Sequence, residues 1–117
     1  MESFEIVKTA VKALDSKKAR DIKVIQIEDI TILADYFVIA TGASSTQVKA
    51  LADEVDYKLS EQGVEPGHIE GKSSGWILLD YGSVVIHVFY KEDREFYALE
   101  HVWQDGKTVN IDEFLEN

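Results

Sequence analysis

The chain has 117 residues, no cysteine and one proline, with 45% hydrophobic and 29% charged residues. This composition is typical of one folded domain, and it excludes disulfides, thiolate nucleophiles and cysteine-ligated zinc. The formal net charge of −10 favours basic protein partners over DNA or an anionic membrane surface, because a negatively charged protein is repelled by phosphate groups. With no apolar run near the ~18–20 residues of a membrane span and no signal peptide, we expect a cytoplasmic protein.

Charge is unevenly distributed along the sequence. Residues 1–23 carry six basic and four acidic side chains, whereas the remainder is strongly acidic. Any contact with RNA would therefore be peripheral and would use Lys17, Lys18, Arg20 and Lys23. The alternative is that these residues form the solvated end of a helix.

The first third of the chain predicts one helix and two strands. Apolar residues at helical spacing indicate an amphipathic helix over residues 3–18, and Ser3 is expected to be its N-cap. Alternating and β-branched residues then indicate strands over 21–28 and 35–41. The second strand is mostly apolar and should be largely buried.

A second helix is predicted after the glycine turn at residues 42–45. Ser44 followed by Gln47 fits a capping box, and Gly63 supplies a C-terminal stop. A helix N-terminus can also bind anions, but this turn matches neither of the common glycine-rich phosphate-binding motifs. Capping therefore explains its serines without a ligand.

The second half of the chain predicts a hairpin flanked by shorter elements. We expect a short strand at 68–70, a strand over 76–81, a tight turn at 82–83 and a central, apolar strand over 84–90. Helical spacing returns between residues 90 and 103. The predicted fold class is α/β, with a mixed sheet of about five strands and helices packed on it.

Few residues are arranged for catalysis or metal binding. His68, His87 and His101 lack the spacing of paired metal ligands, and His87 lies in an apolar strand, where a hydrogen-bonded structural role is expected. Metal-dependent phosphoryl transfer needs converging carboxylates, but residues 76–90 hold only Asp80. We therefore expect no catalytic residues, no metal and no cofactor.

Three blocks of the sequence resemble a known family. They are residues 34–48 (ADYFVIATGASSTQV), residues 70–71 followed by 76–89 (WILLDYGSVVIHVF), and residues 94–103 (REFYALEHVW). Together they are similar to the ribosomal silencing factor family, also called RsfS or Iojap-like proteins. The resemblance covers a domain of residues 1–105 and leaves an acidic tail, 106–117, whose role is open and which we expect to fray.

The resemblance implies a function. Family members bind the large ribosomal subunit through large-subunit ribosomal protein fourteen, a basic protein, and so block joining with the small subunit. This represses translation under nutrient limitation, and a role in large-subunit biogenesis is also attributed to the family. Members are homodimers when free. Their fold is similar to that of nucleotidyltransferases without the catalytic carboxylates, and they are regarded as non-enzymatic.

The same resemblance proposes a partner-binding surface on the last strands and the final helix. Its residue types are those that dominate protein–protein interfaces, namely aromatic and charged side chains. The proposed residues are Trp76, Leu78, Asp80, Tyr81, Arg94, Tyr97 and Glu100.

Two other functions are consistent with parts of the sequence. One is a nucleotidyltransferase-like enzyme that binds a nucleotide with Asp80 and the turn at residues 42–45. The other is an acidic adaptor for a different basic protein. Nucleotide binding would support the first, and a partner outside the ribosome would support the second.

Overall fold

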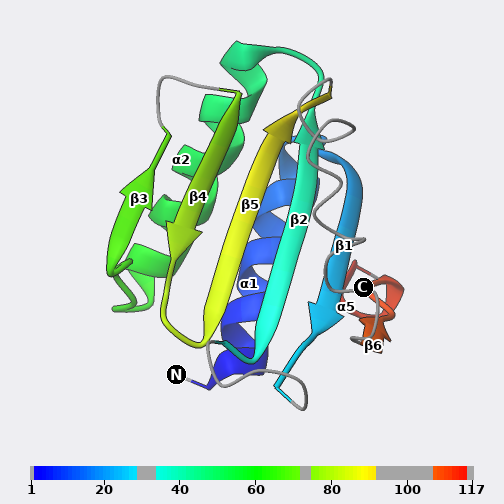
Figure 1. Cartoon of the computed structure of the whole chain (residues 1–117), viewed down its shortest axis with the longest axis vertical. Coiled ribbons are helices and arrows are strands. Elements are labelled where there is room, and N and C mark those ends of the chain that lie inside the picture. Colours follow the sequence, from blue (N-terminus) through cyan, green and yellow to red (C-terminus); the bar gives the residue numbers. More distant parts are fainter. Residues whose placement is uncertain (1, 29–33, 72–74, 92–106, 116–117) are drawn as a thin grey trace.

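The computed structural model describes residues 2–28, 34–71, 75–91 and 107–115, which form one α/β layer structure. Two helices, α1 and α2, lie on one face of a sheet, and the C-terminal elements lie beyond β1, on the side of the sheet away from β3 (Figure 1). The elements are α1 (Ser3–Ser16), β1 (Arg20–Gln26), β2 (Tyr36–Gly42), α2 (Ser45–Glu61), β3 (His68–Glu70), β4 (Trp76–Asp80), β5 (Val84–Tyr90), β6 (Lys107–Val109) and α5 (Asp112–Leu115).

The sheet is mixed, with the strand order β3-β4-β5-β2-β1-β6. β2 and β5 pair in parallel, and the other neighbours pair antiparallel. β5 is therefore an interior strand, as its apolar sequence predicts. The predicted α/β class and mixed sheet are confirmed, with six strands where about five were expected. The helix expected between residues 90 and 103 falls almost entirely outside the described residues.

The sixth strand belongs to the segment expected to be a tail. β6 pairs with β1, and Val24 lies opposite Val109. Val109, Ile111 and Leu115 are partly buried against the main hydrophobic core. The described part of this segment therefore packs on the sheet and on α1, because its few apolar side chains reach the core from the side of the sheet next to β1. The domain boundary at residue 105 stays a prediction.

Helix α1 buries one apolar stripe against α2 and the sheet. Val7, Val11 and Leu14 have no exposed surface, as the spacing predicts. The N-cap prediction was wrong: Glu2 occupies the cap position without a side-chain hydrogen bond. The Ser3 hydroxyl instead donates to Asp35 Oδ2 at 2.7 Å, and so ties the start of α1 to the start of β2.

Helix α2 begins at the predicted cap. The Ser44 hydroxyl accepts from the Gln47 backbone N–H at 3.1 Å, while Gln47 Oε1 accepts from the backbone N–H of Ala43 at 2.5 Å. The Gln47 amide also donates to the carbonyls of Lys17 and Lys18, at 3.2 Å each. One side chain therefore links the start of α2 to the end of α1.

The same helix ends at the predicted glycine. Gly63 has a φ of +80°, which a residue with a Cβ rarely adopts. Its N–H donates to Ser60 O, and the next N–H, of Val64, donates to Leu59 O. This pair of bonds is the Schellman motif, so the stop signal is confirmed.

The core consists of two clusters, one on each face of the sheet. The larger cluster joins α1 and α2 to the helix-facing side chains of the strands. The smaller one, on the outer face, contains Ile25, Ile27, Ala34, Ile39 and Phe89. Among the described residues, no helix combines the length and hydrophobicity that crossing a bilayer requires.

Candidate partner-binding site

Strand β4 separates two sets of side chains by simple alternation. Ile77 and Leu79 are buried in the helix-facing core, whereas Trp76, Leu78 and Asp80 are half-buried on the other face. Successive residues of a strand point to opposite faces, so three of the proposed contact residues share one surface. We call this surface, with its neighbours on β3 and β5, the outer patch; it comprises His68, Glu70, Trp76, Leu78, Asp80 and Val85.

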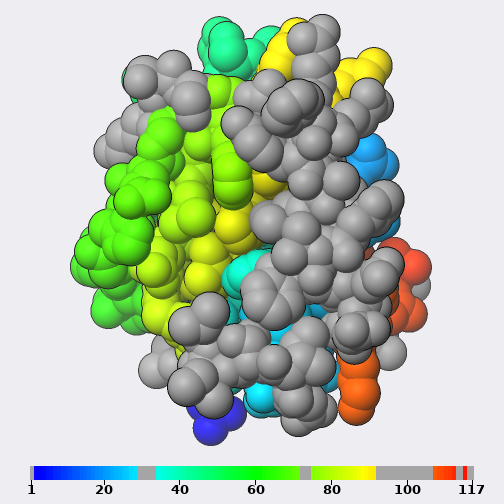
Figure 2. Space-filling model, viewed as in Figure 1, coloured from blue at the N-terminus to red at the C-terminus, as the bar shows by residue number. Residues whose placement is uncertain are grey.

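The outer patch is open to a partner along β3 and β4. Figure 2 shows the side chains of β3 and β4, with part of β5, at the surface on this side of the molecule. Trp76 and Leu78, with Glu70 and Gly71, line a shallow depression of about 240 Å³. The patch thus combines an apolar floor with carboxylates at its edge, an arrangement that suits the long aliphatic stems and charged ends of basic side chains.

Charged groups of the patch come from two neighbouring strands. His68 lies between two carboxylates: its Nδ1 is 3.8 Å from Asp80 Oδ2, and its Nε2 is 3.6 Å from Glu70 Oε1. The register explains this, because His68 is directly opposite Asp80 on β4. Asp80 Oδ1 also accepts from the Gly82 N–H at 2.8 Å, so the carboxylate shapes the hairpin turn as well as the surface.

Tyr81 does not join the outer patch. It follows Asp80 and turns to the other side of the sheet, where it packs against the helix-facing core. Its hydroxyl is buried without a hydrogen-bond partner among the described residues. Burial, and then the carboxylates of Asp56 and Glu65, raise the pKa of Tyr81 well above its usual value. Tyr81 is therefore half-buried on the helix side of the sheet and is not a neighbour of Trp76 and Leu78, and its contact with a partner stays a prediction.

The remaining proposed contacts cannot be placed beside the patch. Arg94, Tyr97 and Glu100 lie outside the described residues, and their roles stay predictions. The structure adds three residues that sequence reasoning did not select as contacts, His68, Glu70 and Val85. The signal was present, because the short strand at residues 68–70 was predicted, but its pairing with β4 and its register were not available from the sequence.

The structure separates the two parts of the hypothetical nucleotide site. Asp80 pairs with Val85 at the start of β5, whereas Gly42 pairs with Tyr90 at its end. Five residues of extended strand span about 17 Å, so Asp80 and the turn at residues 42–45 lie at opposite ends of the sheet. As posed, the nucleotide site was therefore wrong, because β4 runs antiparallel to β5 and β2 runs parallel to it.

Gly42 has a packing role that needs no ligand. A Cβ at this position would lie 2.8 Å from Cγ2 of Val48 and 3.0 Å from its backbone nitrogen. Such a contact is too close for carbon, so only glycine lets β2 approach the first turn of α2 this closely. Close packing and capping together account for the glycine and serines of the turn.

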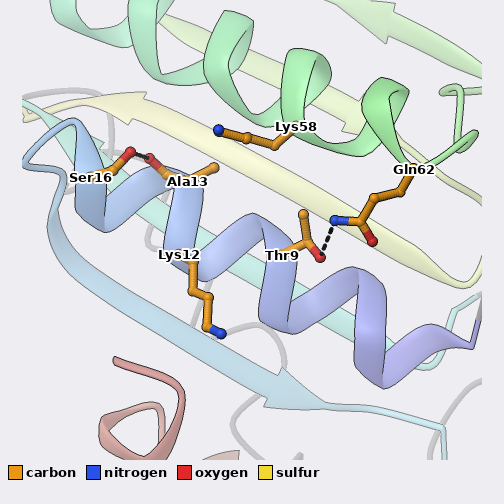
Figure 3. A pocket seen from close by; sticks show the side chains of 6 residues that line it. All are labelled: Thr9, Lys12, Ala13, Ser16, Lys58 and Gln62. Atoms are coloured by element: carbon orange, nitrogen blue, oxygen red, sulfur yellow. Dashed lines mark hydrogen bonds between the residues drawn. The ribbon is translucent and has the colours of Figure 1, made fainter. Parts of the chain in front are cut away.

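The helix side carries a groove with different chemistry. It has a volume of about 330 Å³ and lies between α1 and α2, where Gln62 Nε2 donates to Thr9 Oγ1 at 3.3 Å (Figure 3). Lys12 and Lys58 flank it, and Lys58 is 3.8 Å from Glu61. The six described residues that line the groove include no carboxylate or imidazole, so they offer no acid–base pair for catalysis.

Acidic side chains gather at the start of α1 without forming a metal site. Glu2, Glu28 and Asp35 line an open pocket with Ser3, Phe4 and Tyr36. Burial, and then Glu28 and Asp35, raise the pKa of Tyr36. Within the described residues, no group of three or more histidine, aspartate or glutamate side chains is arranged to hold a metal ion.

The basic residues near the end of α1 are on the surface. Lys17, Lys18, Arg20 and Lys23 are all exposed. Lys18 has a φ of +65°, in the turn that links α1 to β1. These positions suit a solvated helix end, and contact with ribosomal RNA stays a prediction.

The fold defines a class of protein: an α/β domain with a mixed six-stranded sheet and two helices on one of its faces. Comparison with known proteins gives the family. A family model described as "Ribosomal silencing factor during starvation" matches residues 1–117. The chain is 40% identical over 113 residues to the ribosomal silencing factor of Halalkalibacterium halodurans, covering 96% of this chain and 97% of that protein.

Two further relatives agree. A crystal structure of a Chromobacterium violaceum protein superposes with a TM-score of 0.87 at 40% identity, covering 94% of this chain and 92% of that one. The mouse "Mitochondrial assembly of ribosomal large subunit protein 1" is 39% identical over 80% of this chain and 42% of its own length. The chain therefore belongs to the ribosomal silencing factor family, whose members are ribosome-associated regulatory proteins.

Proposed function

We propose that this chain binds the large ribosomal subunit through large-subunit ribosomal protein fourteen and thereby keeps the small subunit from docking. It would act in the cytoplasm, repress translation under nutrient limitation and contribute to large-subunit biogenesis. The observation that carries the proposal is the family match over residues 1–117. The net charge of −10 and the carboxylates of the outer patch support a basic partner.

The site of contact is proposed to be the outer patch together with Arg94, Tyr97 and Glu100. Trp76 and Leu78 would supply the apolar contact, and Glu70 and Asp80 would meet basic side chains at its edge. Interfaces commonly consist of a few such anchors inside a polar rim. Tyr81 lies on the helix side of the sheet, so the contact proposed for it would be separate from the outer patch.

A sucrose gradient tests the proposed activity. Purified large and small subunits are mixed with and without the protein, and the fraction of joined particles is measured. We expect the protein to sediment with the large subunit and to lower the joined fraction. Direct capture of the protein by purified ribosomal protein fourteen is the second arm. Unchanged subunit joining at saturating protein would refute the proposal.

Charge reversal locates the contact. Glu70→Lys should weaken sedimentation with the large subunit at least tenfold, because the Glu70 side chain is 69% exposed beside Trp76 and Leu78. Glu61→Lys is the matched control: it makes the same charge change on α2, where the side chain is 50% exposed. Equal weakening by both variants would show that net charge, rather than the outer patch, directs binding.

Two further parts of the proposal have their own measurements. The free chain is proposed to be a homodimer, which light scattering during gel filtration at two concentrations measures. The protein is also proposed to act without catalysis. Calorimetry with Mg²⁺-ATP and the other nucleotides should give no binding heat, and heat at millimolar nucleotide would revive the enzymatic alternative.

A further inference from the structure

His87 is a buried imidazole in the middle of an otherwise apolar strand. It is 3% exposed, and on β5 it lies opposite Leu78 of β4 and Ile39 of β2. The rings of Phe37, Trp76 and Phe89 surround it at centroid distances of 4.9, 5.9 and 6.2 Å. A polar ring in such a place costs free energy unless its nitrogen atoms are hydrogen-bonded, so its presence needs a reason.

One nitrogen of the imidazole has a specific partner. The indole N–H of Trp76 donates to His87 Nδ1 at 3.1 Å. Nδ1 must therefore carry a lone pair, and this hydrogen bond assigns the ring proton to Nε2. Burial lowers the pKa of His87 to about 4, so the imidazole is neutral at pH 7 and the lone pair stays available. The three aromatic rings around the imidazole are uncharged, and burial is the cause of the lowered pKa.

The hydrogen bond complements a stacking contact. Trp76 stacks on Phe89 with ring centroids 5.0 Å apart and planes inclined by 25°. Stacking restrains the plane of the indole, but a half-turn about the Cβ–Cγ bond keeps that plane and would move Nε1 away from His87. The hydrogen bond to His87 is directional and removes that freedom. The two contacts together fix one orientation of a side chain that lines the outer patch.

We propose that His87 is a positioning residue for partner binding, which acts by holding the Trp76 indole in the orientation that the outer patch presents. This inference rests on the proposed function, because it takes Trp76 to be a contact residue. A side chain that is already fixed loses less conformational entropy when a partner binds it. The cost of burying a polar ring would then be offset by a better-ordered binding surface.

Two substitutions test the role of the acceptor. His87→Leu replaces the imidazole with an apolar side chain of similar size and removes the Nδ1 acceptor. His87→Asn places its Oδ1 near the position of Nδ1 and restores it. We expect His87→Leu to shift the Trp76 indole N–H resonance, to speed its hydrogen exchange at least tenfold, and to weaken sedimentation with large subunits at least tenfold. His87→Asn should retain most of both properties, and Trp76→Phe assigns the resonance.

The outcomes separate this inference from the proposed function. An unchanged indole resonance in a folded His87→Leu variant would overturn the positioning role, and so would a shifted resonance with unchanged large-subunit binding. If the unmodified protein fails to bind large subunits, the proposed function fails while the indole measurement still reports on the hydrogen bond. If His87→Leu does not fold, hydrogen exchange of the Trp76 indole N–H is measured in the unmodified protein, and exchange as fast as that of a free indole would overturn the positioning role.

Discussion

The two faces of the sheet differ in burial and in residue type, although the same strands supply both. On the helix side, Leu79, Ile86 and Val88 are fully buried and purely apolar. On the outer side, the neighbouring positions hold a half-buried Leu78, a histidine and a tryptophan joined by a hydrogen bond. Because side chains alternate along a strand, adjacent residues of β4 and β5 can serve stability on one face and the proposed partner contact on the other. The expected effects of substitution differ accordingly.

The largest expected effect lies on the helix side. Leu79→Ala removes a fully buried side chain and should lower the free energy of unfolding by about 2–5 kcal/mol. Urea unfolding followed by circular dichroism measures this. The folded fraction should still bind large subunits. A loss below about 1 kcal/mol would contradict the assignment of stability to this face.

Acid should reveal the cost of the buried histidine on the outer side. Burial lowers the pKa of His87 to about 4, below the ~6.5 of an unfolded histidine, so the unfolded chain binds the proton more readily. Stability is therefore complete above about pH 6.5 and is lost as the pH falls through 4, by at most about 3 kcal/mol. Urea unfolding from pH 7.5 to 4 measures it against His87→Asn, which should lose less. Parallel curves would contradict this prediction.

The turn between β2 and α2 brings the helix close to the sheet at the end of β2. Gly42→Ala places a Cβ within 3.0 Å of Val48 and should cost about 1–3 kcal/mol of stability through overpacking. Thermal unfolding measures the loss. If Gly42 served only to admit a phosphate group, the alanine variant would be as stable as the unmodified chain.

A smaller effect is expected where the helices meet. Gln47→Ala removes two hydrogen bonds to the carbonyls of Lys17 and Lys18, directly after α1, and one to the backbone of Ala43, all at the surface. We expect a loss of about 1 kcal/mol. Gln62→Ala, which removes a single 3.3 Å bond to Thr9, is the control and should cost less. Equal losses of stability in the two variants would mean that the additional hydrogen bonds of Gln47 contribute no stability.

The smallest effect on stability should come from the residue next to Leu79. Leu78→Ala shortens a half-buried side chain on the outer face and should cost less than about 1 kcal/mol. Its effect on large-subunit binding should be larger, at least threefold, since Leu78 lines the outer patch. Comparing Leu78→Ala with Leu79→Ala by unfolding and by sedimentation tests the division of labour directly. Loss of stability without loss of large-subunit binding in Leu78→Ala would contradict the assignment of partner contact to the outer face.

Local patterns predicted most elements, because their causes are local. The stripe of α1, the Ser44 cap and the Gly63 stop all depend on residues within a few positions of one another. The Ser3 cap failed because the hydroxyl binds Asp35, 32 residues away. β6 was missed because three residues, Lys107–Val109, become a strand only through pairing with β1.

The candidate site was predictable in composition but not in arrangement. The family resemblance pointed to Trp76, Leu78 and Asp80, and alternation along β4 was enough to place them on one face. Tyr81 is not part of the outer patch, because it follows Asp80 by one residue and packs against the core on the helix side. The hydrogen bond from Trp76 to His87 depends on the β4–β5 register and on ring orientation, which no local pattern specifies.

The parallel pair of β2 and β5 at the centre of the sheet affects how this chain folds during its synthesis. Tyr36 lies opposite Val84, so β2 must wait for a strand made 48 residues later, from position 36 to position 84, before its second edge is covered. Contacts this distant along the chain form slowly. Until β5 has left the exit tunnel, the nascent polypeptide lacks the strand that unites its two halves. This chain therefore cannot form its complete sheet, and with it the outer patch, until the ribosome that makes it has synthesised residues 84–90.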